Sequence, residues 1–160
     1  MKIGIIVHSF TGNTLLVAQN LMDALNLAGH TADIERVAVK DENPNVSVNI
    51  ELENAPAAAA YDLLFFGAPV RGFSLSPGMK KYLGQLTGIE GKPAACFITK
   101  QLPHMWTGGN RALKQMTGLI AAKGGHTLGT AAVVWGAKDR QAEIDRAVAA
   151  LLAVAAEGEA

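Results

Sequence analysis

The sequence predicts a doubly wound α/β fold, in which helices cover both faces of a five-stranded parallel sheet. Short apolar runs, typical of buried strands, alternate along the chain with longer segments that have apolar residues at helical spacing. Five such strand segments suit an open sheet, because a closed barrel of this kind needs eight. The chain has 160 residues, so we expect residues 1–160 to form a single domain with a sizeable core.

The first part of the chain contains a strand, a helix and a second strand. Ile3–His8 is an apolar run, as in a strand buried on both faces. Thr14–Leu27 has apolar residues at helical spacing, and Gly29 fits the end of that helix. Thr31–Val37 alternates between apolar and polar residues, as an edge strand does.

Residues 38–60 have no clear periodicity and are expected to form a long, partly ordered connection. Within them, Asn43-Pro44-Asn45 indicates a turn. Ala55–Ala60 is expected to begin a short helix.

The remaining strands are expected at Asp62–Ala68, Lys92–Lys100 and Thr127–Trp135. Pro69 is expected to end the first of these, because proline has no N–H for a sheet ladder. The remaining helices are expected at Ser76–Thr87, with Ser76 as N-cap, and at Thr107–Lys123 and Asp139–Ala156.

The composition excludes several classes of protein. The chain is 49% hydrophobic and 18% charged, which is a globular balance, and its 14 basic and 14 acidic residues cancel. A balanced charge argues against nucleic-acid binding, and no stretch is long enough to be a membrane helix. With no signal-like N-terminus and only Cys96 as a thiol, we expect a cytoplasmic protein.

In open α/β sheets, ligands bind beyond the carboxyl ends of the strands. This rule selects three loops, at residues 8–14, 68–77 and 100–110. The first is the most informative, because Ser9-Phe10-Thr11-Gly12-Asn13-Thr14 joins a buried strand to a helix. Free amides at a helix start bind anions, and four hydroxyl or amide side chains add neutral donors.

This loop contains no lysine or arginine, and it matches neither the P-loop nor the dinucleotide fingerprint. It therefore suits a terminal monophosphate better than a triphosphate. The structural alternative is a simple turn in which Ser, Thr or Asn caps the helix.

Ser9–Thr14 resembles the phosphate loop of the flavodoxins, which reads roughly S/T-x-T-G-N-T at this place. The likeness in length and element order covers nearly the whole chain. It implies the strand order 2-1-3-4-5. It also implies that FMN is the cofactor, that its phosphate is bound by Ser9, Thr11, Gly12, Asn13 and Thr14, and that Phe10 is among the cofactor-binding residues.

The resemblance places the other two loops beside the flavin ring. In the second loop the candidates are Pro69, Val70, Arg71, Gly72 and Phe73, with Phe73 stacking on the ring. In the third loop they are Thr99, Lys100, Gln101, Trp106 and Gly108, with Trp106 as a wall of the site. Alternatively, both aromatic rings are structural, Phe73 packing under the next helix and Trp106 capping an apolar patch.

Typical flavodoxins surround their flavin with acids, and this sequence departs from that pattern. Its second and third loops offer Arg71, Lys100, His104 and Arg111, and Glu90 is the one acid between Ala68 and Arg111. Because reduced flavin is an anion, nearby positive charge favours it, so we expect a less strongly reducing flavin. Alternatively, Arg71 meets an anionic substrate or a nicotinamide-cofactor phosphate, or Arg71 and Lys100 point into solvent.

Two functions follow from the resemblance. The first is an electron carrier that serves a redox partner protein and is a monomer or weak homodimer. The second is an NAD(P)H-dependent flavin or quinone reductase, supported by the basic loops. A phospho-receiver of similar fold would need acids where His8-Ser9 and Ala68-Pro69 stand. No metal-like spacing involves His8 or His104, and Cys96 is expected to be buried and inert.

Overall fold

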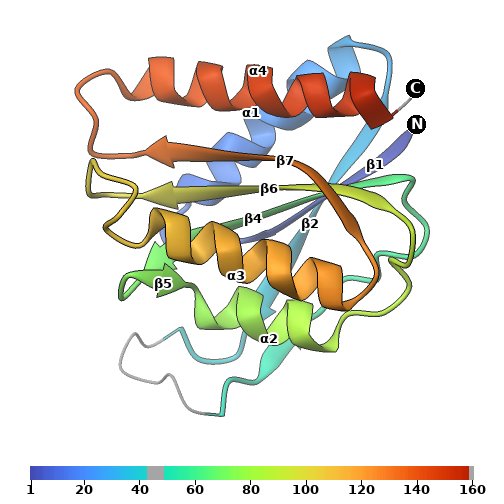
Figure 1. The fold of residues 1–160 in the computed structure, drawn as a ribbon, viewed down its shortest axis with the longest axis horizontal. Helices are drawn as coiled ribbons and strands as arrows, with labels where there is room; N and C mark the ends of the chain where they lie inside the picture. The colour runs from blue at the N-terminus through green and yellow to red at the C-terminus, as the bar shows by residue number, and fades with distance from the viewer. Residues whose placement is uncertain (43–48, 159–160) are drawn as a thin grey trace.

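A computed structural model of the chain describes residues 1–42 and 49–158. These residues form three layers, with a twisted sheet between two pairs of helices (Figure 1). The doubly wound α/β fold expected from the sequence is therefore confirmed.

Five parallel strands form the sheet, and they lie in the expected order 2-1-3-4-5. Within the described residues, two short antiparallel strands that the sequence did not predict join them, one beside β2 and one beside β4. In the order of the sheet the strands are β3 (Leu52–Asn54), β2 (Thr31–Val39), β1 (Lys2–His8), β4 (Leu63–Arg71), β6 (Pro93–Lys100) and β7 (His126–Val134), with β5 (Ser74–Leu75) paired to β4.

Two helices cover each face of the sheet. One face carries α1 (Asn13–Leu27) and α4 (Arg140–Gly158), and the other carries α2 (Pro77–Gln85) and α3 (Gly109–Ala122) (Figure 1). All four helices were predicted, and their ends differ from the expected positions by at most two residues. Helix boundaries shift in this way because their terminal turns have few hydrogen bonds.

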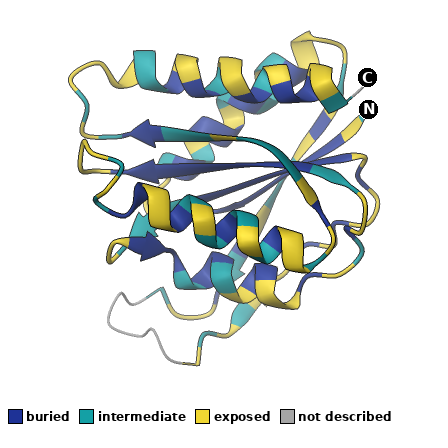
Figure 2. Cartoon of the chain, in the orientation of Figure 1, coloured by how far each residue is buried: buried dark blue, intermediate teal, exposed yellow. Residues whose placement is uncertain are grey.

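The alternation of side chains along the central strands divides the core into two layers. In β1 and β4, Ile5 and Phe65 point to the α1/α4 face, and Ile6 and Phe66 point to the α2/α3 face. All four side chains are fully buried, and the central strands are mostly dark blue in Figure 2, the colour of buried residues. Strands covered on both faces have no polar side, which explains why they appear in the sequence as continuous apolar runs.

The prediction that Pro69 ends its strand was wrong, because β4 continues to Arg71 and then turns back into β5. The pairing of β4 with β1 ends at Gly67, and its pairing with β6 continues as far as Pro69. Beyond Gly67 one side of β4 no longer faces β1, so the missing N–H of proline disrupts no ladder there.

The short helix expected at Ala55–Ala60 is absent, and this described segment is extended or turned. Its backbone oxygens are bonded elsewhere: the Pro56 carbonyl accepts a hydrogen bond from the Tyr82 hydroxyl, at 2.6 Å, and the Ala59 carbonyl accepts one from the Lys92 ammonium, at 2.8 Å. Tertiary contacts therefore replace the helix. The turn expected at Asn43–Asn45 lies outside the described residues.

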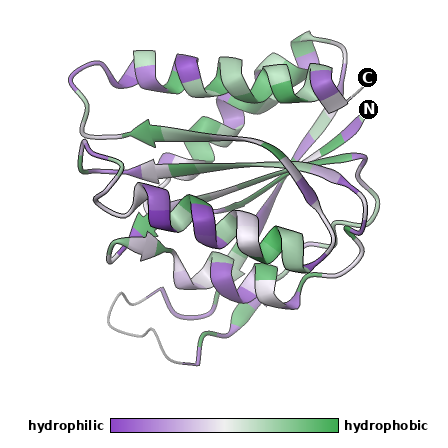
Figure 3. Cartoon of the chain, in the orientation of Figure 1, coloured by the Kyte–Doolittle hydropathy of each residue, from purple (hydrophilic) through white to green (hydrophobic). Residues whose placement is uncertain are grey.

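None of the described helices is long and apolar enough to cross a membrane. The hydropathy colouring shows why, because polar bands interrupt every helix (Figure 3). The apolar stripes of the helices face the sheet, which is the pattern of helices that pack on one side.

Candidate functional site

Three loops meet at the carboxyl edge of the sheet, where the strand arrowheads of Figure 1 lie. Two adjoining pockets lie between them, with volumes of about 150 Å³ and 210 Å³. Together they are lined by Phe10, Thr11, Asn13, Pro69, Val70, Arg71, Gly72, Phe73, Thr99, Lys100, Gln101, Leu102 and Thr107. We define these two pockets as the candidate site.

The first loop presents free backbone donors at the start of α1. Gly12 is the N-cap residue and has a left-handed φ of 96°. Within the described residues, the N–H groups of residues 11–14 have no hydrogen-bond acceptor. The Ser9 hydroxyl lies behind the loop and accepts a hydrogen bond from the Leu15 N–H, at 3.3 Å. Because a helix start carries partial positive charge, this arrangement favours an anion.

The hydroxyl of Thr14 is used inside the protein and does not face the pocket. It forms a 2.9 Å hydrogen bond with the hydroxyl of Thr99, at the end of β6, and both residues are buried. This bond joins the first loop to the third. Thr14 was expected to donate its side chain to a phosphate, but in this structure its hydroxyl is bonded to Thr99, and among the described residues its N–H has no acceptor.

Arg71 is held against the first loop and does not extend into solvent. Its guanidinium lies 4.3 Å from the centroid of the Phe10 ring, and one of its nitrogens is 3.6 Å from a carboxylate oxygen of Glu42. A cation above an aromatic face is attracted by the ring quadrupole. Arg71 thus places a positive charge at the wall of the candidate site.

A buried polar chain continues from Glu42 into the protein. The other oxygen of Glu42 lies 3.0 Å from His8 Nε2, and His8 Nδ1 lies 2.8 Å from the Ser76 hydroxyl. A Cβ added to Gly78 would lie only 2.9 Å from the His8 ring, so α2 approaches that ring closely. The sequence did not predict these linked contacts of Arg71, Glu42, His8 and Ser76, because Glu42 lies in the region without periodicity.

The second loop is a two-residue hairpin turn that exposes an aromatic ring. Gly72 and Phe73 have φ values of 59° and 60°, and the flanking residues Arg71 and Ser74 pair with each other. This is the type I′ pattern, which needs positive φ at both central residues. Phe73 is a bulky residue in a left-handed conformation, and its side chain is 59% exposed. Strain of this kind, typically 1–3 kcal/mol, is concentrated at functional sites.

Lys100 is a buried cation without a carboxylate partner among the described residues. Its ammonium donates to the carbonyls of Leu102 and His104 and to the Thr107 hydroxyl, with the latter two bonds at 2.7 Å and 2.8 Å. Burial lowers the pKa of this ammonium. The ammonium therefore shapes the third loop from inside and adds positive charge to the floor of both pockets.

Two predicted residues of the third loop do not line the pockets. Trp106 is 78% exposed and stacks on His104, with ring centroids 5.6 Å apart. Gly108 has a φ of 108°, and a Cβ there would lie 2.7 Å from the Cα of Phe73. The third loop can therefore pack against the hairpin tip only because position 108 has no side chain.

The N-cap residues of the helices that border the candidate site do not cap them with their side chains, and in α1 the one first-turn N–H with a described side-chain acceptor is that of Leu15, bonded to Ser9. The N-cap residues of α1, α2 and α3 make no capping hydrogen bond, and their first turns contain no acid. Ser76 occupies the N-cap of α2 as predicted, but its hydroxyl bonds to His8. In α4, by contrast, Asp139 accepts a hydrogen bond from the Ala142 N–H. The uncapped starts leave partial positive charge at the carboxyl edge.

Of the sixteen residues predicted from the sequence, eleven line the two pockets. The other five lie behind or beside them, and these are Ser9, Gly12, Thr14, Trp106 and Gly108. Leu102 and Thr107 also line the pockets and were not on that list. Both lie within the third loop, two and seven residues after Lys100, so the loop was selected correctly but these two members were not.

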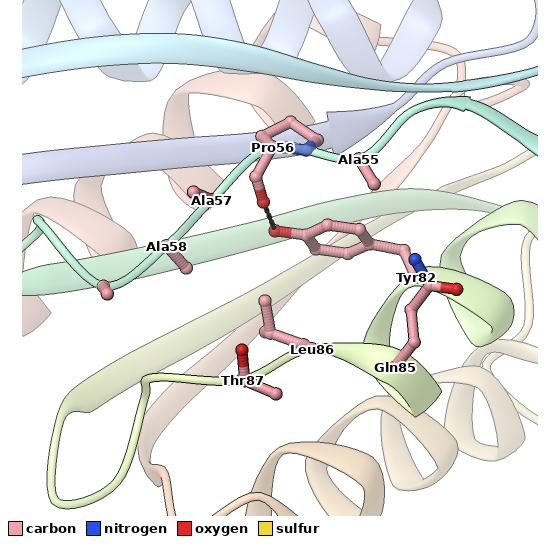
Figure 4. Close-up of a pocket in the computed structure, with 9 residues that line it drawn as sticks. Ala55, Pro56, Ala57, Ala58, Tyr82, Gln85, Leu86 and Thr87 are labelled. Carbon is pink, nitrogen blue, oxygen red and sulfur yellow. Dashed lines mark hydrogen bonds between the residues drawn. The ribbon is translucent and has the colours of Figure 1, made fainter.

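Other chemistry-bearing residues lie apart from this site. Cys96 is buried in β6, as expected, and burial raises the pKa of its thiol to about 12. The described residues contain no group of three or more His, Cys, Asp or Glu that could hold a metal ion. Another pocket, of about 270 Å³, lies between residues 55–59 and the end of α2, and Figure 4 shows that no charged side chain lines it.

No protein-family model matches the chain. Among curated proteins, it is 32% identical over 122 residues to the NAD(P)H dehydrogenase (quinone) of Archaeoglobus fulgidus. The match covers 64% of this chain and 63% of the length of that relative.

Several solved structures share the arrangement of strands and helices. An archaeal flavodoxin matches with a TM-score of 0.70 and 12% identity, over 100% of both chains. A WrbA-like flavodoxin from Agrobacterium tumefaciens matches with a TM-score of 0.69 and 16% identity, over 99% of this chain and 97% of the flavodoxin chain. A flavoprotein in complex with FMN from Lactobacillus acidophilus matches with a TM-score of 0.65 and 18% identity. This match covers 91% of the present chain and 97% of the flavoprotein.

These likenesses define the class of the molecule. The chain has a doubly wound α/β fold with a ligand-sized site at the carboxyl edge of its parallel sheet. More particularly, its fold is that of the flavodoxins, as the resemblance of Ser9–Thr14 to their phosphate loop predicted.

Proposed function

We propose that the chain is a single-domain FMN protein that carries electrons to or from a partner protein. The observation that carries this proposal is the start of α1, where four consecutive N–H groups are free and no cationic side chain belongs to the loop. Such a cradle suits a terminal phosphate held by neutral donors and the helix dipole.

The donor set at this loop fits a phosphomonoester. The side chains of Thr11 and Asn13 line the pocket and have no hydrogen-bond partner among the described residues. An amide and a hydroxyl can donate to phosphate oxygens without neutralising their charge. A Cβ at Gly12 would meet nothing within 4 Å, so there is open space beside the free amides.

The neighbouring loops fit a flat aromatic ring. The rings of Phe10 and Phe73 line the two adjoining pockets, and both are exposed without a ligand. Val70 and Gln101 line both pockets, so an apolar side chain and a polar amide are shared by the two. Sites for small ligands combine apolar walls with a few placed polar groups in this way.

When bound, FMN supplies the capacity to accept and release electrons, and the protein's share is to hold it and set its environment. In this chain, residues 11–14 would hold the phosphate, and Phe73 would bound the ring. Arg71 and Lys100 would add positive charge beside it.

The test is titration of the purified chain with FMN and, as a matched control, with riboflavin, which lacks the phosphate. We expect FMN to bind with quenching of flavin fluorescence and riboflavin to bind much more weakly. The variant Asn13→Leu should reduce the preference for FMN over riboflavin. Failure to bind FMN, or equal affinity for both compounds, would refute the proposed phosphate loop.

A second function, an NAD(P)H-dependent quinone reductase, is supported by the Archaeoglobus fulgidus relative. The positive charge of Arg71 and Lys100 at the site is compatible with an anionic nucleotide or a reduced quinone. Stopped-flow mixing of the FMN-loaded chain with NADH and with NADPH separates the two functions. Rapid loss of flavin colour would favour the reductase, and inertness to both nucleotides would favour the carrier.

A further inference from the structure

The two helices on one face of the sheet carry only positive charge. The helices α2 and α3 contain Lys80, Lys81, Arg111 and Lys114 and no aspartate or glutamate. On the opposite face, α1 and α4 contain two basic and four acidic residues. The helices of the two faces therefore differ in charge, whereas the chain as a whole is neutral. Separated charge of this kind orients a protein during association.

Three of these cations lie around a groove between α2 and α3. Lys80 and Lys114 line the groove, whose volume is about 390 Å³. Arg111 is close enough that its charge, after burial, lowers the pKa of Lys80. No described carboxylate forms a salt bridge with any of the three. We call Lys80, Arg111, Lys114 and the groove they border the basic groove.

The floor of the basic groove is neutral and open to solvent. It is formed by Gln115, Gly118 and Leu119. A Cβ added to Gly118 would meet nothing within 4 Å, so a partner can approach the backbone of α3 there. A shallow trough with an apolar floor and cations at its edge suits a protein surface better than a compact small molecule.

The basic groove is physically connected to the candidate site. Gln115 lies in its floor, and the amide oxygen of Gln115 accepts hydrogen bonds from the Ser74 hydroxyl and the Leu75 N–H, both at 2.9 Å. These two residues form β5, directly after the turn that exposes Phe73. A partner bound in the basic groove would therefore lie next to the turn that carries Phe73, at the edge of the candidate site.

We propose that the basic groove is the docking surface for an acidic electron-transfer protein. The argument is charge complementarity, because Lys80 and Lys114 line an open groove that adjoins the site and Arg111 lies near Lys80. Among the described residues none of the three cations has a carboxylate partner. The role of the partner rests on the proposed function, whereas the acidic character of its surface follows from the groove itself. Rim charges of this kind mainly accelerate association and select partners.

The test measures binding to an immobilised acidic plant-type ferredoxin at low and high ionic strength, with the chain loaded with FMN and also without it. The variant Lys80→Gln/Arg111→Gln/Lys114→Gln removes the three cations. The matched control, Lys2→Gln/Lys123→Gln/Lys138→Gln, removes the same charge outside the groove. Basic cytochrome c serves as the probe of opposite sign.

We expect the unmodified chain to bind ferredoxin at low ionic strength and to lose affinity as salt is added. The groove variant should bind on the order of tenfold more weakly and should be less sensitive to salt. The control should keep most of the affinity. FMN affinity, measured separately, should be the same in all three proteins, so a failure to bind FMN would count against the proposed function alone.

Five outcomes would overturn the proposal. The chain fails to bind ferredoxin in either form, the groove variant binds as well as the unmodified chain, or the control variant weakens equally. The fourth is that cytochrome c binds and loses affinity in the groove variant. Saturable binding of NADP⁺ that the groove variant abolishes, and that competes with ferredoxin, would assign the basic groove to a nucleotide instead.

Discussion

The hydroxyls of Thr14 and Thr99 are joined by a 2.9 Å hydrogen bond, which links the start of α1 to the end of β6 inside the protein. Replacing Thr99 with the isosteric valine would leave the buried Thr14 hydroxyl without its partner. We expect Thr99→Val to lower the free energy of unfolding by about 1–3 kcal/mol. Urea denaturation of the chain without cofactor measures this change.

The control for this prediction is Thr130→Val, because Thr130 lies exposed in β7 and makes no side-chain hydrogen bond among the described residues. Its effect should stay within about 0.5 kcal/mol. Equal effects of the two substitutions would show that the bond between Thr14 and Thr99 adds no stability.

Gly108 and Gly118 predict opposite effects of the same substitution. Gly108→Ala would place a Cβ 2.7 Å from the Phe73 backbone at a φ of 108°, so we expect a loss of more than about 1 kcal/mol. Gly118→Ala lies inside α3 with free space around it, so we expect a gain of up to about 1 kcal/mol. Thermal unfolding of both variants tests the pair, and stabilisation by Gly108→Ala would contradict the packing described for the third loop.

Phe73 combines a strained backbone with an exposed ring, and two variants separate these properties. Phe73→Ala removes the ring and keeps a side chain at positive φ, whereas Phe73→Gly also removes the strain. Glycine should be more stable than alanine there by about 1–2 kcal/mol. Both should weaken FMN binding to a similar degree, as measured by fluorescence titration. Unchanged FMN affinity in both variants would exclude Phe73 from the cofactor site.

The positive charge of Lys100 should raise the reduction potential of bound FMN, because reduced flavin is an anion. We expect Lys100→Met to lower the potential by on the order of 30 mV, which is about 1.4 kcal/mol for a two-electron couple. Spectroelectrochemical titration measures this shift, with Lys123→Met as the control far from the site. A potential that rises or stays constant in Lys100→Met would refute the expected effect of the basic loops.

Burial of Cys96 predicts a loss of stability in alkaline solution. Burial raises the pKa of its thiol from 9.0 to about 12, so the folded chain keeps a proton that the unfolded chain releases. The free energy of unfolding should therefore fall as the pH rises above 9.0, by up to about 1.4 kcal/mol per pH unit. Denaturant unfolding at a series of pH values tests this.

Cys96→Ala should remove the part of this decline that begins at pH 9.0. Burial also raises the pKa values of Tyr82 and Tyr61 above their ordinary value of 10.0, so a second decline should begin there. Tyr82→Phe should make this second decline smaller, and Tyr61 should account for the part that remains. Identical pH profiles for the unmodified chain and Cys96→Ala would show that the thiol does not contribute.

The fold was largely predictable because its strands are covered on both faces. A strand buried on both sides, such as β1 or β4, must be apolar throughout, and helices that pack on one side must be apolar at helical spacing. Both patterns involve residues close together in the sequence, so they can be recognised from the sequence alone. The position of Ser9–Thr14 after the first strand then indicated where the candidate site lies.

The features that the sequence did not reveal depend on contacts between distant segments. Pro69 normally ends a strand, and its tolerance in β4 depends on where β1 stops. The hydrogen bonds from Ser76 through His8 to Glu42 join three segments that are far apart in the sequence, and no local sequence pattern indicates that these segments meet. The left-handed Phe73 was equally hidden, because few bulky residues adopt that conformation.

The uncapped starts of α1, α2 and α3 have a consequence for the lifetime of the protein. A capping side chain at the N-cap typically contributes about 1 kcal/mol, and the N-cap residues of these three helices make no such bond. An anion held at this edge would act as an external cap, so the chain should unfold less often when the cofactor is bound. Proteases that act on opened chains would then remove the empty protein first, and its abundance in a cell would follow the supply of cofactor.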